Sequence, residues 1–145
     1  MLVAGTHRAI ELLEGLLRED AELVSARSVR EALARLDEGD YDTIACNVRF
    51  DESRMFEFLQ GVRERPGGER ARVVSFRAGG SRLSPSMRDA IRHGLEALGV
   101  EVFLDLPQLQ ADFGREAALV LLRDAVLGGP ACSSIAATQR GRGKH

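Results

Sequence analysis

The chain has 145 residues, of which 44% are apolar and 29% are charged, and its formal net charge at neutral pH is -2. This balance is typical of one soluble globular domain and excludes a disordered or fibrous chain. The longest apolar runs have only strand length and the start lacks the basic residues of a signal peptide, so we expect a cytoplasmic protein without a membrane span. Cys46 and Cys132 have no CxxC spacing, which argues against a disulfide or a zinc site.

Charge is divided unevenly along the chain. Residues 1–127 contain 17 basic and 22 acidic residues, a net charge of -5, whereas residues 128–145 contain three basic residues and no acidic one. An acidic body does not attract nucleic acid by charge. We therefore expect a folded domain over residues 1–127, followed by a flexible basic tail, residues 128–145, that is too short to fold as an output domain.

Short apolar or β-branched runs alternate in the body with stretches of helical spacing. The expected strands are residues 2–4, 22–26, 42–48, 72–76 and 100–104, and the expected helices begin at Thr6, Ser28, near residue 53, at Ser84 and near residue 111. Five successive strand–helix units predict an α/β fold with one five-stranded parallel sheet. Helices would cover both faces of this doubly wound sheet, which gives three layers in a flavodoxin-like arrangement.

Capping residues and apolar spacing define the helices more closely. Thr6 is a candidate N-cap, Ser28 forms a capping box with Glu31, and Ser84 precedes Pro85 at the first helical position. Gly39 and Gly99 mark two of the helix ends. The residues expected on the buried faces are Ile10, Leu13, Leu16, Leu17, Val29, Leu33, Leu36, Met55, Phe58, Leu59, Val62, Met87, Ile91, Leu95, Leu98, Phe113, Ala117, Val120, Leu121 and Leu127.

Doubly wound sheets bind ligands beyond the carboxyl ends of their strands. That rule selects residues that follow or end the expected strands, and we expect them to meet in one shallow depression. The set is Gly5, Thr6, Asn47, Arg77, Asp105, Leu106 and Pro107. Asn47, the only asparagine of the chain, ends the buried segment YDTIACNVRF, and the only lysine, Lys144, lies in the tail and cannot serve this site.

At these residues the chain resembles the receiver domain of two-component response regulators, the CheY-like family. The resemblance covers residues 2–127 and rests on the strand–helix rhythm, the segment DTIACNVR, Ala78 after the fourth strand, and Pro107. It implies that Asn47 stands where receivers carry the phospho-accepting aspartate. It also implies that the peptide bond before Pro107 is cis, as in many receivers.

The resemblance implies a receiver whose phosphorylation chemistry is lost. Receivers use an aspartate nucleophile, acidic residues after the first strand that hold Mg²⁺, and a hydroxyl with a lysine that neutralises the phosphoryl oxygens. The corresponding positions here are Asn47, Gly5 with Thr6, Arg77 and Leu106. A neutral amide is a poor nucleophile and a dication finds no carboxylate there, so we expect no catalysis, no metal and no cofactor.

Arg77 has three alternative roles. It could fold inward and pair with Asp105 or bond to Asn47, it could point to solvent, or it could hold an anionic ligand. The last possibility leaves open a flavodoxin-like module that binds an anionic metabolite or nucleotide through Arg77. An enzyme would need converging titratable groups, for which the sequence offers only Asp105, Asp51 and His7.

Other reactive residues favour structural roles. Cys46 is expected to be a buried thiol, His7 and His93 to face solvent, and Asp51 with Glu52 to form a solvated loop. His145 belongs to the tail. The loop at residues 78–81 lacks the glycine patterns of dinucleotide or P-loop sites.

The sequence thus predicts a degenerate receiver, or pseudo-receiver, that acts in signal transduction by protein contact and independently of phosphorylation. The resemblance implies that the contact face comprises the fourth helix, the fifth strand and the fifth helix, about residues 84–127. Arg88, Arg92, Gln108 and Gln110 are candidate contact residues because they are polar and expected on the exposed side. The partner would be another signalling protein, with a homodimer as one form of contact, and neither nucleic acid nor membrane is expected.

Overall fold

Five short strands form one parallel sheet in the computed structural model, which describes residues 1–66, 68, 71–100 and 102–128. The strands are β1 (Leu2–Ala4), β2 (Val24–Ala26), β3 (Thr43–Asn47), β4 (Arg72–Arg77) and β5 (Val102–Asp105), in the order β2-β1-β3-β4-β5. All five predicted strands occur, with ends that differ by one or two residues. The chain reverses its direction of winding between β1 and β3.

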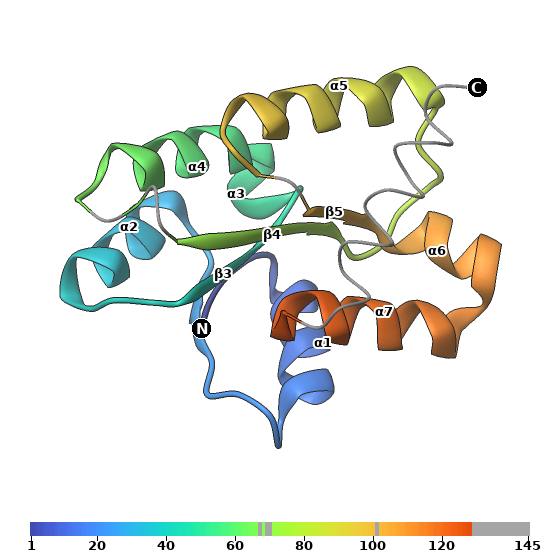
Figure 1. The fold of residues 1–145 in the computed structure, drawn as a ribbon, viewed down its shortest axis with the longest axis horizontal. Coiled ribbons are helices and arrows are strands. Elements are labelled where there is room, and N and C mark those ends of the chain that lie inside the picture. The colour runs from blue at the N-terminus through green and yellow to red at the C-terminus, as the bar shows by residue number, and fades with distance from the viewer. Residues whose placement is uncertain (67, 69–70, 101, 129–145) are drawn as a thin grey trace.

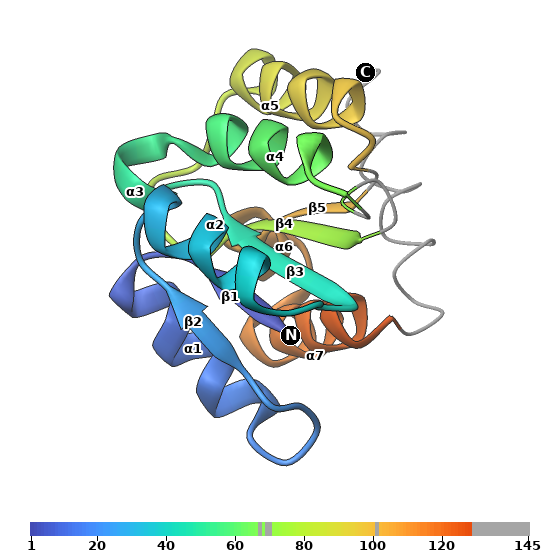
Figure 2. The same cartoon turned by 90° about the vertical axis from the view of Figure 1, so that its left-hand side faces the viewer.

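Helices cover both faces of the sheet, as the alternation of elements predicts. One face is covered by α1 (His7–Leu17), α6 (Leu106–Phe113) and α7 (Arg115–Leu127), and the other by α2 (Val29–Glu38), α3 (Phe50–Ser53), α4 (Met55–Glu64) and α5 (Pro85–Ala97) (Figures 1 and 2). Each face has its own apolar core. Val3, Ala45 and Val74 belong to the core under α1 and α7, while Ile44 and Cys46 belong to the other.

Side-chain caps fix three helix starts where the sequence places them. The hydroxyls of Thr6, Ser28 and Ser84 accept hydrogen bonds from the backbone N–H groups of Ala9, Glu31 and Met87, at 3.3, 3.1 and 3.2 Å. Each bond satisfies one of the N–H groups that a helix start leaves without a partner. Gly99, with a φ of 74°, lies just beyond the end of α5, as expected for a glycine that follows a helix.

The last predicted helix, near residues 111–127, is two helices. Gly114 adopts a φ of 89° between α6 and α7, a conformation that favours glycine, and α6 begins directly after β5 at Leu106. The predicted cis bond before Pro107 is also wrong, because the described chain contains no cis peptide bond.

Of the five residues predicted to be buried in the last helix, Leu121 is partly buried against the core and the other four are exposed. Phe113, Val120 and Leu127 are 49%, 55% and 39% exposed, and Ala117 is exposed too. The residues that α7 buries are Ala118, Leu122, Ala125 and Val126. These four have helical spacing too, so α7 is apolar on two faces and its periodicity alone cannot select one. The predicted burial of Met87 on α5 also fails, since this side chain is 55% exposed.

No helix within the described ranges has both the length and the apolar content needed to cross a bilayer. The predicted tail, residues 128–145, lies outside the described residues except for Gly128. This glycine follows α7 in the left-handed conformation, with φ 80° and ψ 22°.

Two truncations on α7 test which face is buried. Leu122→Ala is expected to lower the free energy of unfolding by about 2–5 kcal/mol because it leaves a cavity under a fully buried side chain. Val120→Ala, on the exposed face, is expected to change it by less than about 0.5 kcal/mol. Urea titrations of both variants measure the difference, and equal losses would contradict the assignment.

Candidate functional site

The predicted site residues lie at the carboxyl edge of the sheet. Asn47, Arg77 and Asp105 are the last residues of β3, β4 and β5, and the register of β4 and β5 places Arg77 opposite Asp105. Gly5 follows β1, which pairs with β3, and a Cβ atom on Gly5 would lie 3.4 Å from the Asn47 Cβ. Thr6 caps α1, and Leu106 begins α6. The sheet therefore gathers these residues along one edge, as the sequence predicts.

Arg77 and Asp105 form a buried ion pair. Nη1 of Arg77 donates to Oδ1 of Asp105 at 3.1 Å, and the two residues are only 3% and 1% exposed. Nη2 of Arg77 donates to the backbone carbonyl of Ser81, in the loop that leads to α5. Of the three roles considered for Arg77, the structure has inward pairing with Asp105, and the solvent-facing alternative is wrong.

The ion pair connects three segments: the end of β4, the end of β5 and the β4–α5 loop. A charge taken out of water loses several kcal/mol of solvation, so both partners depend on each other and on the Ser81 carbonyl for compensation. Oδ2 of Asp105 is buried and accepts no hydrogen bond from the described residues. Because Arg77 is buried and bonded to Asp105 and Ser81, its guanidinium group is not accessible to an external anion.

The side chain of Asn47 stabilises the local turn of the chain. Its Oδ1 accepts the backbone N–H of Arg49 at 2.7 Å, and the residue is 3% exposed. Asparagine side chains commonly close turns of this kind by bonding to the backbone two residues ahead. The amide therefore supports the start of the β3–α4 connection and offers no anionic oxygen to a reacting group.

Asn47, Arg77 and Asp105 line neither the cavity of about 570 Å³ nor the one of about 420 Å³, so a depression lined by the whole set stays a prediction. These three residues are almost completely buried, with exposed fractions of 3%, 3% and 1%. Two other members of the predicted set, Leu106 and Pro107, line the cavity of about 570 Å³.

The connection after β3 has an unusual backbone. Asp51, Glu52 and Ser53 have φ angles of 47°, 57° and 69°, and the N–H of Arg54 bonds to the carbonyl of Phe50 at 2.8 Å. Three consecutive residues other than glycine thus form a left-handed turn, which costs roughly 1–2 kcal/mol per residue. The predicted third helix therefore begins only at Met55, as α4.

Asp51 compensates part of this strain through contacts that the sequence does not reveal. Its Oδ2 accepts the N–H of Val29 at 2.8 Å, at the start of α2, and is 3.2 Å from Nη1 of Arg54. The prediction of a merely solvated loop is wrong for Asp51, while Glu52 is exposed. Among the residues that the structure describes, no cluster of three or more His, Cys, Asp or Glu side chains could hold a metal ion.

The candidate contact residues are less accessible than predicted. Gln110 is exposed, but Arg88, Arg92 and Gln108 are partly buried. Gln108 accepts hydrogen bonds from Arg82 and Arg88 at 3.0 and 3.2 Å, and Arg92 lies 3.8 Å from Asp89. The prediction that these residues are exposed is therefore wrong for three of the four.

The reactive side chains do not assemble a second site. Cys46 is fully buried, and burial raises the pKa of its thiol, so a thiolate is disfavoured. His7 is on the surface, with Nε2 3.0 Å from Glu11, and His93 is exposed. These three positions agree with the sequence predictions, whereas His145 lies outside the described residues.

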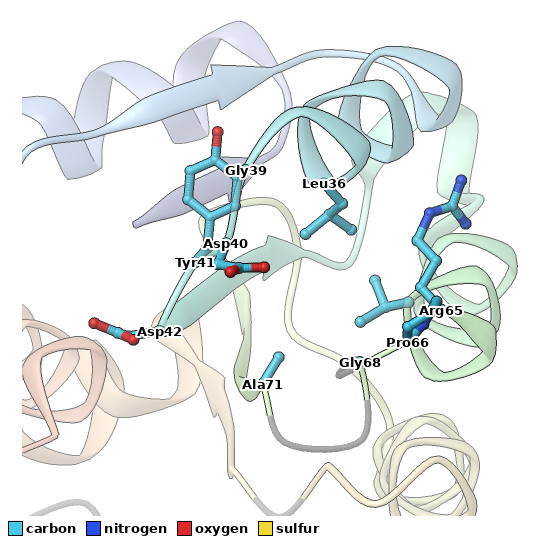
Figure 3. A pocket seen from close by; sticks show the side chains of 10 residues that line it. Leu36, Gly39, Asp40, Tyr41, Asp42, Arg65, Pro66, Gly68 and Ala71 are labelled. Atoms are coloured by element: carbon cyan, nitrogen blue, oxygen red, sulfur yellow. The ribbon is translucent and has the colours of Figure 1, made fainter.

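A second cavity, of about 420 Å³, lies at the opposite end of the sheet. It is bordered by the ends of α2 and α4 and by the approach to β3, with Leu36, Tyr41 and Arg65 among its lining residues (Figure 3). Arg65 donates to Asp37 at 2.9 Å, and this hydrogen bond lowers the pKa of the Asp37 carboxyl. The cavity is far along the strands from Asn47 and is separate from the predicted site.

Solved structures of response regulators are similar to this chain. The chemotaxis response regulator CheY4 of Vibrio cholerae is 22% identical with a TM-score of 0.62, over 84% of this chain and 92% of that one. A response regulator from Hahella chejuensis is 16% identical with a TM-score of 0.64, over 85% and 91%. No protein-family model and no curated protein matches the chain.

The chain has the CheY-like fold. The five-stranded parallel sheet and its two helical layers confirm the predicted fold class. At these levels of identity the likeness concerns the fold, and the roles of individual residues depend on the geometry described above.

A mutational cycle tests the ion pair. Arg77→Met and Asp105→Leu are each expected to cost about 3–5 kcal/mol of unfolding free energy because each leaves a buried charge without its partner. The double variant should lose less than the sum of the two, since it removes both charges. Thermal and urea unfolding measure the cycle.

The control for this cycle is the surface pair of Arg35 and Glu38, which are 3.5 Å apart with side chains that are 44% and 67% exposed. Arg35→Met should change stability by less than about 1 kcal/mol. A similarly small effect of Arg77→Met would show that the buried pair does not hold the strand ends.

Proposed function

We propose that this protein is a receiver-like signalling module that works by protein contact and without aspartyl phosphorylation. The observation that carries the proposal is the closed edge of the sheet, where Asn47 lies beside the buried pair of Arg77 and Asp105. Phosphoryl transfer to a receiver needs an accessible carboxylate and a bound dication. Here the residue at the end of β3 is an amide, and the nearby carboxylate is already paired with a guanidinium.

In this proposal the ion pair of Arg77 and Asp105 holds one conformation, and no switching step is needed. Arg77 holds the β4–α5 loop through the Ser81 carbonyl and holds β5 through Asp105. A fixed positive charge at this point needs no modification in order to keep the loop in one position. The segment from α5 to α7 would therefore present a constant surface, and the proposal assigns no catalytic residue and no cofactor.

Exposed apolar side chains support a contact function for that segment. Met87, Phe113, Val120 and Leu127 are the large apolar residues exposed on α5, α6 and α7, and only Phe56 is comparable elsewhere in the described ranges. Apolar side chains that remain in water are typical of surfaces that bind other proteins. These residues replace Arg88, Arg92 and Gln108 as the best candidates for partner contact, and the partner would be a signalling protein or a second copy of this chain.

The alternative of an anion held by Arg77 is not favoured by the geometry. The guanidinium is 3% exposed and donates to Asp105 and Ser81. An external anion would have to displace Asp105 from a buried pair, which costs several kcal/mol.

Incubation with acetyl phosphate and Mg²⁺ tests independence from phosphorylation. We expect the intact mass to stay unchanged, because the site offers no free carboxylate to accept the phosphoryl group. A receiver domain with an intact aspartate serves as the positive control under the same conditions. A hydroxylamine-sensitive acyl phosphate on Asp105 would refute the proposal.

Substitutions on two helix surfaces test the contact face. Val120→Arg on α7 should weaken partner binding at least tenfold, which corresponds to about 1.4 kcal/mol, because it places a charge in an apolar contact. Ala34→Arg, at an exposed position of α2, adds the same charge away from the face and should have no effect. Quantitative mass spectrometry after copurification from the native cell identifies the partner, and sedimentation detects self-association. Equal losses with both variants would contradict the assigned face.

A further inference from the structure

A groove lies between the helices of one sheet face and the β4–α5 loop. Its volume is about 570 Å³, and its lining residues come from α1, α6, α7 and residues 78–80. Figure 1 shows α1, α6 and α7 together on this face of the sheet. Leu12, Leu106 and Leu119 are buried or partly buried side chains that line the groove. The volume lies within the range of about 300–1,000 Å³ that small-molecule sites occupy.

Two arginines lie at the rim of this groove. Arg8 and Arg115 are exposed lining residues, and the described part of the chain provides neither with an ion-pair partner. Glu11 is the only acidic lining residue, and its carboxylate is 3.0 Å from Nε2 of His7. The groove thus combines three leucine side chains with two guanidinium groups and the Glu11 carboxylate.

The positions of the arginines on their helices are electrostatically unfavourable. Arg8 is the second residue of α1, and Arg115 is the first residue of α7. The start of a helix carries a partial positive charge, so a cation there is repelled and an anion is attracted. The first turn of α1 also contains no acidic residue that could offset this repulsion. An external anion would relieve this repulsion at the start of α1, whereas at the start of α7 Glu116 already offsets part of it.

We propose that this groove binds a small organic anion that has an apolar body and a carboxylate or phosphate group. The anionic group would lie between Arg8 and Arg115, and the apolar body would lie against the leucines. This site differs from the anion site predicted at Arg77 and does not depend on the proposed signalling function.

The groove also borders the segments that the buried ion pair joins. Leu106 follows Asp105 directly, and Ala78 follows Arg77. A bound anion would therefore contact the chain next to both members of the pair, at Ala78 and Leu106.

Fluorescence titration with the dye 1-anilinonaphthalene-8-sulfonate tests the site on the folded full chain. The dye has one sulfonate and an apolar aromatic body, so we expect saturable binding with one dye per chain. The double variant Arg8→Gln/Arg115→Gln should bind at least tenfold more weakly. The neutral dye N-phenyl-1-naphthylamine should bind weakly to both proteins, because it lacks the anionic group.

The matched control is Arg18→Gln/Arg30→Gln, which removes the same charge at exposed positions outside the groove. Arg30 is the second residue of α2, as Arg8 is of α1. The control should bind the dye like the unmodified chain, and thermal unfolding should show that the groove variant is no less stable than the control. Equal dye affinity of the groove variant and the unmodified chain, or the absence of saturable binding, would overturn the proposal.

Discussion

The buried ion pair of Arg77 and Asp105 is the interaction on which the carboxyl edge of the sheet depends. Two charges that are almost completely removed from water must satisfy each other, so the ends of β4 and β5 cannot separate without a large loss of solvation energy. The second hydrogen bond of Arg77, to Ser81, extends this constraint to the β4–α5 loop. With Asn47 closing its own turn beside the pair, the edge that holds ligands in many doubly wound folds is filled by the protein itself.

Because the polar residues at this edge bond to one another or to the local backbone, the surfaces available for binding lie on the helical layers. Exposed apolar side chains occur on α5, α6 and α7, and the groove with Arg8 and Arg115 lies between α1, α6 and α7. Both surfaces adjoin the ion pair through short connections, since α6 starts at the residue after Asp105. The proposed function relies on these surfaces for binding and assigns no covalent modification to the protein.

Arginine also joins elements elsewhere in the body, which contains no lysine. Arg63 donates to the carbonyls of Leu98 and Gly99 at the end of α5, and Arg72 donates to those of Ala125 and Val126 at the end of α7. A planar guanidinium can bond to several carbonyls at once, whereas an ammonium is a compact charge with no fixed fork. The cation also interacts favourably with the negative end of each helix dipole.

The sequence by itself determined the order of strands and helices and the burial of Cys46, because both follow from the spacing of apolar residues. It also determined the helix caps at Thr6, Ser28 and Ser84, because these are local hydrogen bonds. The lack of a carboxylate at the end of β3 follows from the sequence as well. Only the tertiary structure decided which face of α7 is buried, because both faces of this helix are apolar. Gly114 separates α7 from α6, so the apolar spacing does not continue from one helix into the next. The tertiary structure also decided that Arg77 turns inward, that Asp51 accepts a hydrogen bond from the start of α2, and that Arg8 and Arg115 line one groove. Each of these depends on residues far apart in the chain, and no local pattern records which distant groups will become neighbours.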